Sequence, residues 1–191
     1  MKPSFLLPRL SMVAVATCLG IVTLPTAARA SVLITLIESG GNVNVIGGGT
    51  INLTGLTFSF NSSGSGSLVA NEGVVFVGDF SDIVVYDGAT GPTNFGSGGF
   101  SFPTSTTGSM FGIRGNNSRI AVPLGYVNTT LSGSATWTSA SFVSLGLTPG
   151  TYTWNWGSGA TAESYSGRSK LRGMPRKASA LEPKPQKKWA S

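Results

Sequence analysis

The chain has 191 residues, enough for one domain of ordinary size, and its formal net charge is +6 at pH 7. The basic residues concentrate at the two ends, because the stretch 31–160 holds only Arg114 and Arg119 against five carboxylates, namely Glu38, Glu72, Asp79, Asp82 and Asp87. This balance argues against a nucleic-acid partner, and the absence of histidine, with Cys18 as the single cysteine, excludes a disulfide framework and a Cys/His zinc site.

Residues 1–30 have the three parts of a secretory signal peptide. Lys2 and Arg9 form a positively charged start, and an apolar run follows over residues 10–24. The leader ends in an A-x-A cleavage site, so that the residues flanking the predicted cut are Ala28, Ala30 and Ser31, the last of these being the first residue of the mature chain.

Two alternative interpretations of this leader are weaker. A membrane anchor needs about 20 apolar residues, whereas this run is shorter and is interrupted at its end by Pro25. A lipid anchor on Cys18 would require a smaller residue than Thr17 before the cysteine. We therefore expect a secreted protein, extracellular or at the cell surface, with no stable membrane anchor after cleavage.

The stretch that follows the leader alternates short apolar runs with glycine-rich turns, and no part of it up to residue 157 shows a sustained helical period. Spacing and composition favour an all-β domain over residues 31–164, an antiparallel β-sandwich of jelly-roll-like form. The main predicted strands, in chain order, cover residues 31–38, 42–45, 50–60, 68–70, 73–77, 83–86, 110–113, 120–127, 134–142 and 152–156.

The predicted strand 50–60 contains a change of phase at Gly55. Its apolar residues share one parity before this glycine and the other parity after it, the two sets being Ile51 and Leu53, then Leu56, Phe58 and Phe60. We favour a β-bulge at Gly55, which would keep both sets on one face of the sheet. Two strands with a break at Gly55 are the alternative.

The clearest single strand follows a turn at residues 148–150. Three aromatic residues alternate there with small polar ones, and they are Tyr152, Trp154 and Trp156. A period of two built from such residues predicts a strand with one aromatic face, and we expect this face to close the core.

Three acidic residues lie close together in the sequence, namely Asp79, Asp82 and Asp87. They are only a weak candidate for a calcium site, because their spacing matches no EF-hand loop and aspartate is common in turns for conformational reasons. A Ser-His-Asp triad needs a histidine, and nothing in the sequence marks a pair of carboxylates for glycoside hydrolysis. We therefore expect no catalytic activity and no cofactor.

From residue 165 the composition changes to a basic, proline-containing segment with few aliphatic residues. Such a segment buries too little apolar surface to offset the entropy lost on ordering, so we predict a disordered tail over residues 165–191. The predicted organisation is therefore a signal peptide (1–30), a β-sandwich domain (31–164) and this tail.

Three stretches of the predicted domain carry a family resemblance. They are SVLITLIESGGNVNVIGGGTINLTGLTF (31–58), GATGPTNFGSGGFSF (88–102) and SLGLTPGTYTWNWGSGA (144–160). Through them the chain resembles the small secreted cyanobacterial proteins of the PEP-CTERM sorting group. These stretches are recurrent phrases without a catalytic signature, so the resemblance implies kinship and implies no reaction.

The resemblance also implies a C-terminal continuation. Members of the group continue with another strand, a Val-Pro-Glu-Pro motif, an apolar span and a basic end, and we expect none of these after Ala160. The tripeptide Leu181-Glu182-Pro183 is a faint echo of the motif, without an apolar span after it. We interpret the tail as out of frame with the ancestral gene, so the membrane-sorting step of the group is not expected here.

These features together predict a secreted, non-catalytic structural or adhesive protein of the cell surface or extracellular matrix. The alternative is a carbohydrate-binding or hydrolytic β-domain that acts on exopolysaccharide, since exposed aromatic side chains can stack on sugar rings. Both interpretations imply extracellular polysaccharide or cell-surface components as partners.

Cleavage after Ala30 can be tested directly on exported protein. Because the A-x-A site ends at this residue, N-terminal sequencing should read Ser-Val-Leu-Ile. An exported chain that keeps Met1, or a lipid found on Cys18, would contradict the prediction.

Overall fold

The computed structural model describes residues 31–171, so the predicted signal peptide and residues 172–191 lie outside the described part. One sheet has six strands in the order β12-β13-β1-β2-β11-β8, with bounds Thr151–Trp156, Glu163–Leu171, Ser31–Ser39, Asn42–Gly49, Leu131–Trp137 and Ser105–Gly108. The other has seven in the order β3-β6-β10-β9-β5-β4-β7, with bounds Thr57–Gly64, Ser81–Asp87, Arg119–Pro123, Phe111–Arg114, Val74–Val77, Ser67–Val69 and Phe100–Ser101. Within these residues no helix is long and apolar enough to cross a membrane.

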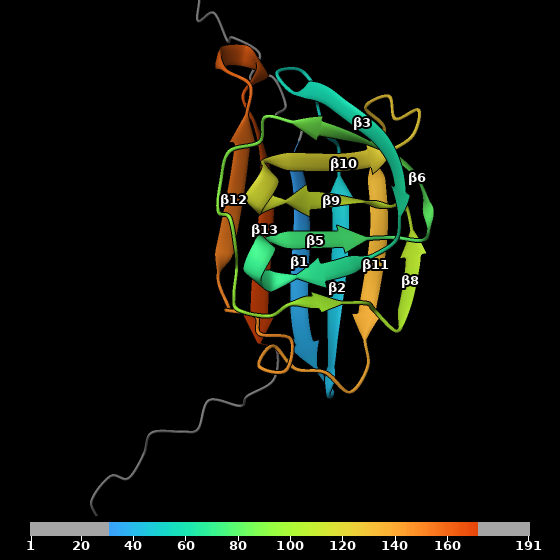
Figure 1. Cartoon of the computed structure of the whole chain (residues 1–191), viewed down its shortest axis with the longest axis vertical. Coiled ribbons are helices and arrows are strands. Elements are labelled where there is room, and N and C mark those ends of the chain that lie inside the picture. The colour runs from blue at the N-terminus through green and yellow to red at the C-terminus, as the bar shows by residue number, and fades with distance from the viewer. Residues whose placement is uncertain (1–30, 172–191) are drawn as a thin grey trace, which may run out of the picture.

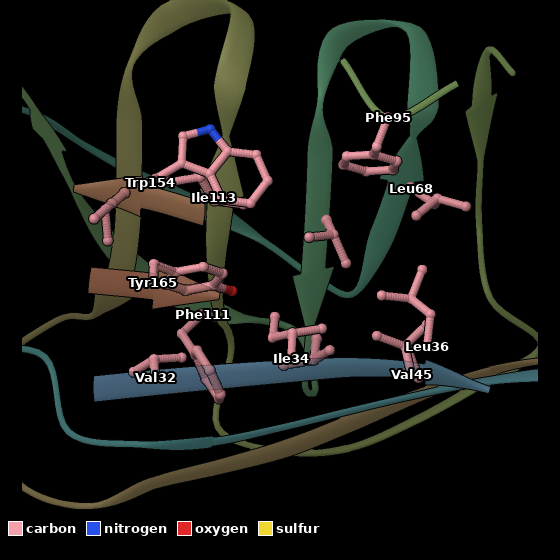
Figure 2. Close-up of a cluster of buried hydrophobic side chains, with 14 of the residues drawn as sticks. Val32, Ile34, Leu36, Val45, Leu68, Phe95, Phe111, Ile113, Trp154 and Tyr165 are labelled. Atoms are coloured by element: carbon pink, nitrogen blue, oxygen red, sulfur yellow. The ribbon is translucent and has the colours of Figure 1, made fainter. Parts of the chain in front are cut away.

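The two sheets pack against each other as a sandwich, and the strands of the seven-stranded sheet run across those of the six-stranded sheet behind it (Figure 1). Strand pairs are antiparallel except for β1 with β13, which is parallel. One hydrophobic cluster fills the space between the sheets with side chains from both (Figure 2). The predicted all-β sandwich, rich in antiparallel pairs, is confirmed.

Strands β1 and β2 show how the sequence selects the core face. Val32, Ile34 and Leu36 are buried at alternate positions of β1, as period-two side-chain alternation requires. Gly40 and Gly41 then close the hairpin with φ values of +61° and +74°, a backbone region that glycine enters without a steric penalty.

The aromatic face of β12 points into the core, as predicted. Trp154 and Trp156 are both buried, and their indole Nε1 atoms donate hydrogen bonds to the backbone oxygens of Pro92 at 2.9 Å and of Asn52 at 2.8 Å. Each buried N–H group therefore has an acceptor, which avoids the penalty of an unsatisfied donor. Trp154 also packs edge-on against Tyr165, with 6.1 Å between ring centroids (Figure 2).

The predicted start of the tail at residue 165 is wrong, and so is the expectation that no strand follows Ala160. Residues Glu163–Leu171 form β13, which lies between β12 and β1 and pairs with both. Tyr165 is completely buried in this strand. The polar composition of this segment wrongly predicts disorder. The strand has polar residues on its outward positions, and it is stabilised by one buried tyrosine and by backbone hydrogen bonds to a strand on each side. The rest of the predicted tail lies outside the described residues.

The phase change at Gly55 is a turn, so the favoured bulge at this residue is wrong. The alternative of two strands is right about the break, but residues 50–56 form no strand. Gly55 has φ +90°, and the backbone N–H of Leu56 donates to the carbonyl of Leu53 at 3.0 Å. A Cβ at Gly55 would lie 2.7 Å from the Cα of Gly157, so the close approach of two loops also requires glycine. Strand β3 begins only after this turn.

Truncation tests the structural role of β13. A chain from Ser31 to Ser164 should lose the cooperative thermal transition, because it lacks the buried Tyr165, worth about 3–5 kcal/mol for a large core aromatic, and removes the partner of β12. A chain from Ser31 to Leu171 keeps every strand described above and should retain the transition. Circular dichroism melts of the two chains measure the difference, and coincident melts would show that β13 is dispensable.

Candidate binding groove on the outer face of the seven-stranded sheet

The outer face of the seven-stranded sheet carries an apolar floor. Because side chains alternate along a strand, every second residue of β5, β6, β9 and β10 points away from the main core. The apolar residues that gather on this face form a second buried cluster, separate from the main one, with Phe76 packed against it: Ile83, Val85, Met110 and Ala121. The floor of this face is therefore apolar and buried, although it lies outside the main core.

Three phenylalanine side chains surround this floor. Phe60 of β3 is 41% exposed, while Phe100 and Phe102, at the edge formed by β7, are 62% and 67% exposed. These rings line a groove of about 320 Å³ over the floor. A second hollow of about 310 Å³ shares four of the lining side chains, namely Ser67, Phe76, Phe100 and Arg114. Each hollow reaches the lower end of the size range of small-molecule sites.

A β-bulge turns Phe60 toward this groove. In the pairing of β3 with β6, Phe58 lies opposite Tyr86 and Phe60 lies opposite Val85, so Ser59 is an extra residue. Without this extra residue the two phenylalanines would share one face. With it, the ring of Phe58 packs edge-on against Tyr86, at 6.5 Å between centroids, and Phe60 lines the groove.

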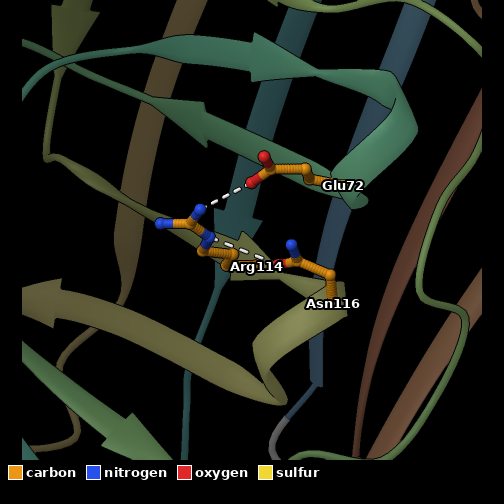
Figure 3. A network of polar contacts seen from close by, with 3 residues as sticks. All are labelled: Glu72, Arg114 and Asn116. Atoms are coloured by element: carbon orange, nitrogen blue, oxygen red, sulfur yellow. Dashed lines mark hydrogen bonds and ion pairs between the residues drawn. The ribbon is translucent and has the colours of Figure 1, made fainter.

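Arg114, the last residue of β9, lines both hollows. Its Nη2 donates to a carboxylate oxygen of Glu72, and its Nε donates to the side-chain oxygen of Asn116 at 3.3 Å (Figure 3). Glu72 and Asn116 belong to the 3-10 turns Ala70–Glu72 and Gly115–Asn117, so two turns hold the guanidinium in place. The other terminal nitrogen points away from both partners (Figure 3), which leaves N–H donors for a groove ligand.

Arg119 of β10 is the cross-strand neighbour of Arg114 and contacts Phe60. Its Nε donates to Asp87 at 2.8 Å, and its guanidinium carbon lies 5.2 Å from the centroid of the Phe60 ring. The hydrogen bond from Arg119, with a second one from Ser59, lowers the pKa of the Asp87 carboxyl below its usual value. Asp87 is therefore ionised at neutral pH, which is the wrong protonation state for a general acid.

The structure does not bring the three aspartates of the calcium candidate together. Asp79 lies in the turn before β6, where it accepts hydrogen bonds from the Thr106 hydroxyl at 2.8 Å and the Gly108 N–H at 3.0 Å. Asp82 and Asp87 lie near opposite ends of β6, about 16 Å apart at roughly 3.3 Å per residue. Residues 31–171 contain no group of three potential metal ligands, so the candidate forms no site in the described chain.

The predicted cleavage site falls at the boundary of the described residues. Ala28 and Ala30 lie outside them, and Ser31 is the first residue of β1.

Two features of the sequence point to the groove once the fold is known. Phe100 and Phe102 alternate within a glycine- and serine-rich segment, and Arg114 and Arg119 are the only basic residues of the stretch 31–160.

The Arg119–Asp87 pair gives a test by NMR titration. Replacing Arg119 with Gln should raise the pKa of Asp87 toward its usual value, whereas Arg114→Gln should leave it unchanged. Because the folded-state pKa is lowered, the pair contributes stability above the unfolded pKa and loses it as pH falls through the folded one. The free energy of unfolding should therefore fall slightly less on acidification in Arg119→Gln than in the wild type. The difference is small because both side chains of the pair are partly exposed. An unchanged Asp87 titration would mean that the pair does not form in solution.

Comparisons with known proteins add no family to this description. A scan against models of known protein families found no match, and searches of curated proteins and of solved structures found none either.

Proposed function

We propose that this protein is a secreted, non-catalytic structural or adhesive domain, which acts at the cell surface or in the extracellular matrix. The observation that supports this function is the groove on the outer face of the seven-stranded sheet. Its exposed aromatic rings lie over a buried apolar floor, and residues from every strand of the sheet line it. A rigid sheet face with such rings is suited to binding a partner without altering it.

The carboxylates that pair with the two groove arginines support a binding function over hydrolysis. Glycoside hydrolysis needs one protonated carboxylic acid and a second carboxylate facing the same bond. Glu72 and Asp87 instead each accept a hydrogen bond from an arginine, and the pKa of Asp87 is lowered, the opposite of what a general acid requires.

Carbohydrate binding is the second candidate function, because the side chains of the groove suit a sugar ligand. Aromatic faces stack on the apolar faces of sugar rings, and the free N–H groups of arginine donate hydrogen bonds to sugar oxygens. Serine hydroxyls at the same groove, from Ser62, Ser63, Ser65 and Ser67, can both donate and accept. Exopolysaccharide at the cell surface is the source of sugar that this proposal implies.

The proposal includes kinship with the PEP-CTERM sorting group. It is supported by the three stretches quoted above, two of which contain β1 and β12, strands that flank β13. The resemblance implies one more strand after residue 160, and β13 stands at that place in the chain. The export of the mature domain and its position outside the cell rest on the leader and on this kinship.

A glycan array with matched variants tests the groove. Phe102→Ala removes a ring that lines it, and Phe80→Ala removes a ring that is 73% exposed but lies outside it. We expect Phe102→Ala to bind the glycan roughly tenfold more weakly than the wild type and Phe80→Ala to bind it equally well. The factor follows because aromatic stacking contributes up to about 1.5 kcal/mol, and about 1.4 kcal/mol corresponds to a factor of ten in affinity.

Three further measurements on the same proteins separate the competing functions. Binding to surfaces or matrix without any glycan preference would favour the structural or adhesive function over carbohydrate binding. Release of new reducing ends from a bound polysaccharide would overturn the proposal that the domain is non-catalytic. Equal losses in Phe102→Ala and Phe80→Ala would show that the groove is not the contact surface.

A further inference from the structure

The carboxylate of Glu163 is buried and incompletely paired. Glu163 is the first residue of β13 and is only 6% exposed. Its Oε1 accepts a long hydrogen bond of 3.4 Å from the side-chain amide of Asn52, and its Oε2 is buried with no hydrogen-bond partner in the described chain. A buried carboxylate oxygen without a donor is destabilising, so this position calls for a partner.

None of the basic side chains of the described residues supplies that partner. Arg114 and Arg119 are engaged with Glu72 and Asp87 on the outer face of the other sheet. Arg168 and Lys170 belong to β13 itself but are exposed, whereas Glu163 is buried. The described basic side chains therefore leave the Glu163 carboxylate without a cationic partner.

The start of β1 lies at the same level as Glu163. The parallel register of β1 and β13 places Ser31 opposite Ser164 and Val32 opposite Tyr165, so the backbone nitrogen of Ser31 is level with the peptide that joins Glu163 to Ser164. Neighbouring strands are about 4.8 Å apart, a distance that a glutamate side chain can span. The predicted cleavage after Ala30 would convert this nitrogen into the α-amino group of the mature chain.

We infer that the α-ammonium group of Ser31, created when the leader is removed, pairs with the carboxylate of Glu163. Hydrolysis of the Ala30–Ser31 peptide bond consumes one water and leaves a carboxylate on Ala30 and an amine on Ser31. This amine is protonated at neutral pH, since its ordinary pKa is about 7.7–8.0. It offers charge-assisted N–H donors where the uncut chain has one neutral amide N–H. Processing thus completes the contact between the first and last strands of the described chain.

The inference predicts that a free amino terminus stabilises the fold through Glu163. The predicted mature chain, residues 31–191, is prepared with a free α-amino group and again with that group acetylated, and thermal midpoints are compared at pH 7. We expect the free form to melt several degrees higher. In E163Q the same pair of forms should show no difference, because the amide carries no charge to attract the ammonium.

Other outcomes overturn the inference. Equal midpoints for the free and acetylated wild-type chains would exclude a stabilising pair, and this comparison does not require E163Q to fold. A difference of the same size in E163Q would assign the effect to another acceptor. As an independent measurement, an amine-reactive reagent should modify the Ser31 amine more slowly in the folded wild-type chain than in E163Q or in the unfolded chain. Exported protein that begins elsewhere than Ser31 would overturn the inference for the natural protein, whatever the melts show.

Discussion

The insertion of β13 between β12 and β1 is the interaction on which the rest of the sandwich depends. It joins the end of the described chain to its beginning through a parallel ladder and carries Tyr165 into the core beside Trp154. Within residues 31–171, β12 has no other strand partner in its sheet, and at its far edge Asn155 forms an isolated bridge with Thr90. The six-stranded sheet is therefore complete only after the last of its strands has been made, since β13 closes a contact of high sequence separation.

Small residues make the outer groove possible. Gly112 and Ala121 are paired neighbours on β9 and β10, and a Cβ at Gly112 would lie 2.2 Å from the ring of Phe76. The Phe76 ring therefore occupies the space that a side chain at position 112 would need. Phe60, Phe100 and Phe102 stay exposed around the floor, where a partner can reach them.

The two arginines of the outer face, Arg114 and Arg119, form ion pairs within the fold and also keep N–H donors for a ligand. Each is held by a carboxylate from a neighbouring element. This contact fixes the guanidinium but does not use all of its N–H donors. Fixed donors lose little conformational entropy when a ligand binds, so such residues favour affinity. The ion pairs themselves are partly exposed and contribute little to the stability of the fold.

The sequence by itself determined the features that depend on local pattern. Alternation in β1, β2 and β12 identified strands and their buried faces, and the absence of a helical period identified the all-β class. It did not reveal β8, since Ser105–Gly108 has no apolar residue to show a period. Residues 138–142, predicted as strand, form turns after β11 ends at Trp137.

Only the tertiary structure decided the features that depend on distant partners. Glu163–Leu171 reads as a polar segment, and it is a strand because β1 and β12 offer backbone groups on both sides and a cavity that Tyr165 fills. Whether Phe60 faces the core or the groove depends on one extra residue, Ser59, in the pairing of β3 with β6. The groove combines residues from all seven strands of its sheet with loop residues. The position of Glu163 near the first residue of β1 is a matter of register. Local sequence fixes the period of a strand, whereas its neighbours and their register are set by long-range packing and backbone hydrogen bonds.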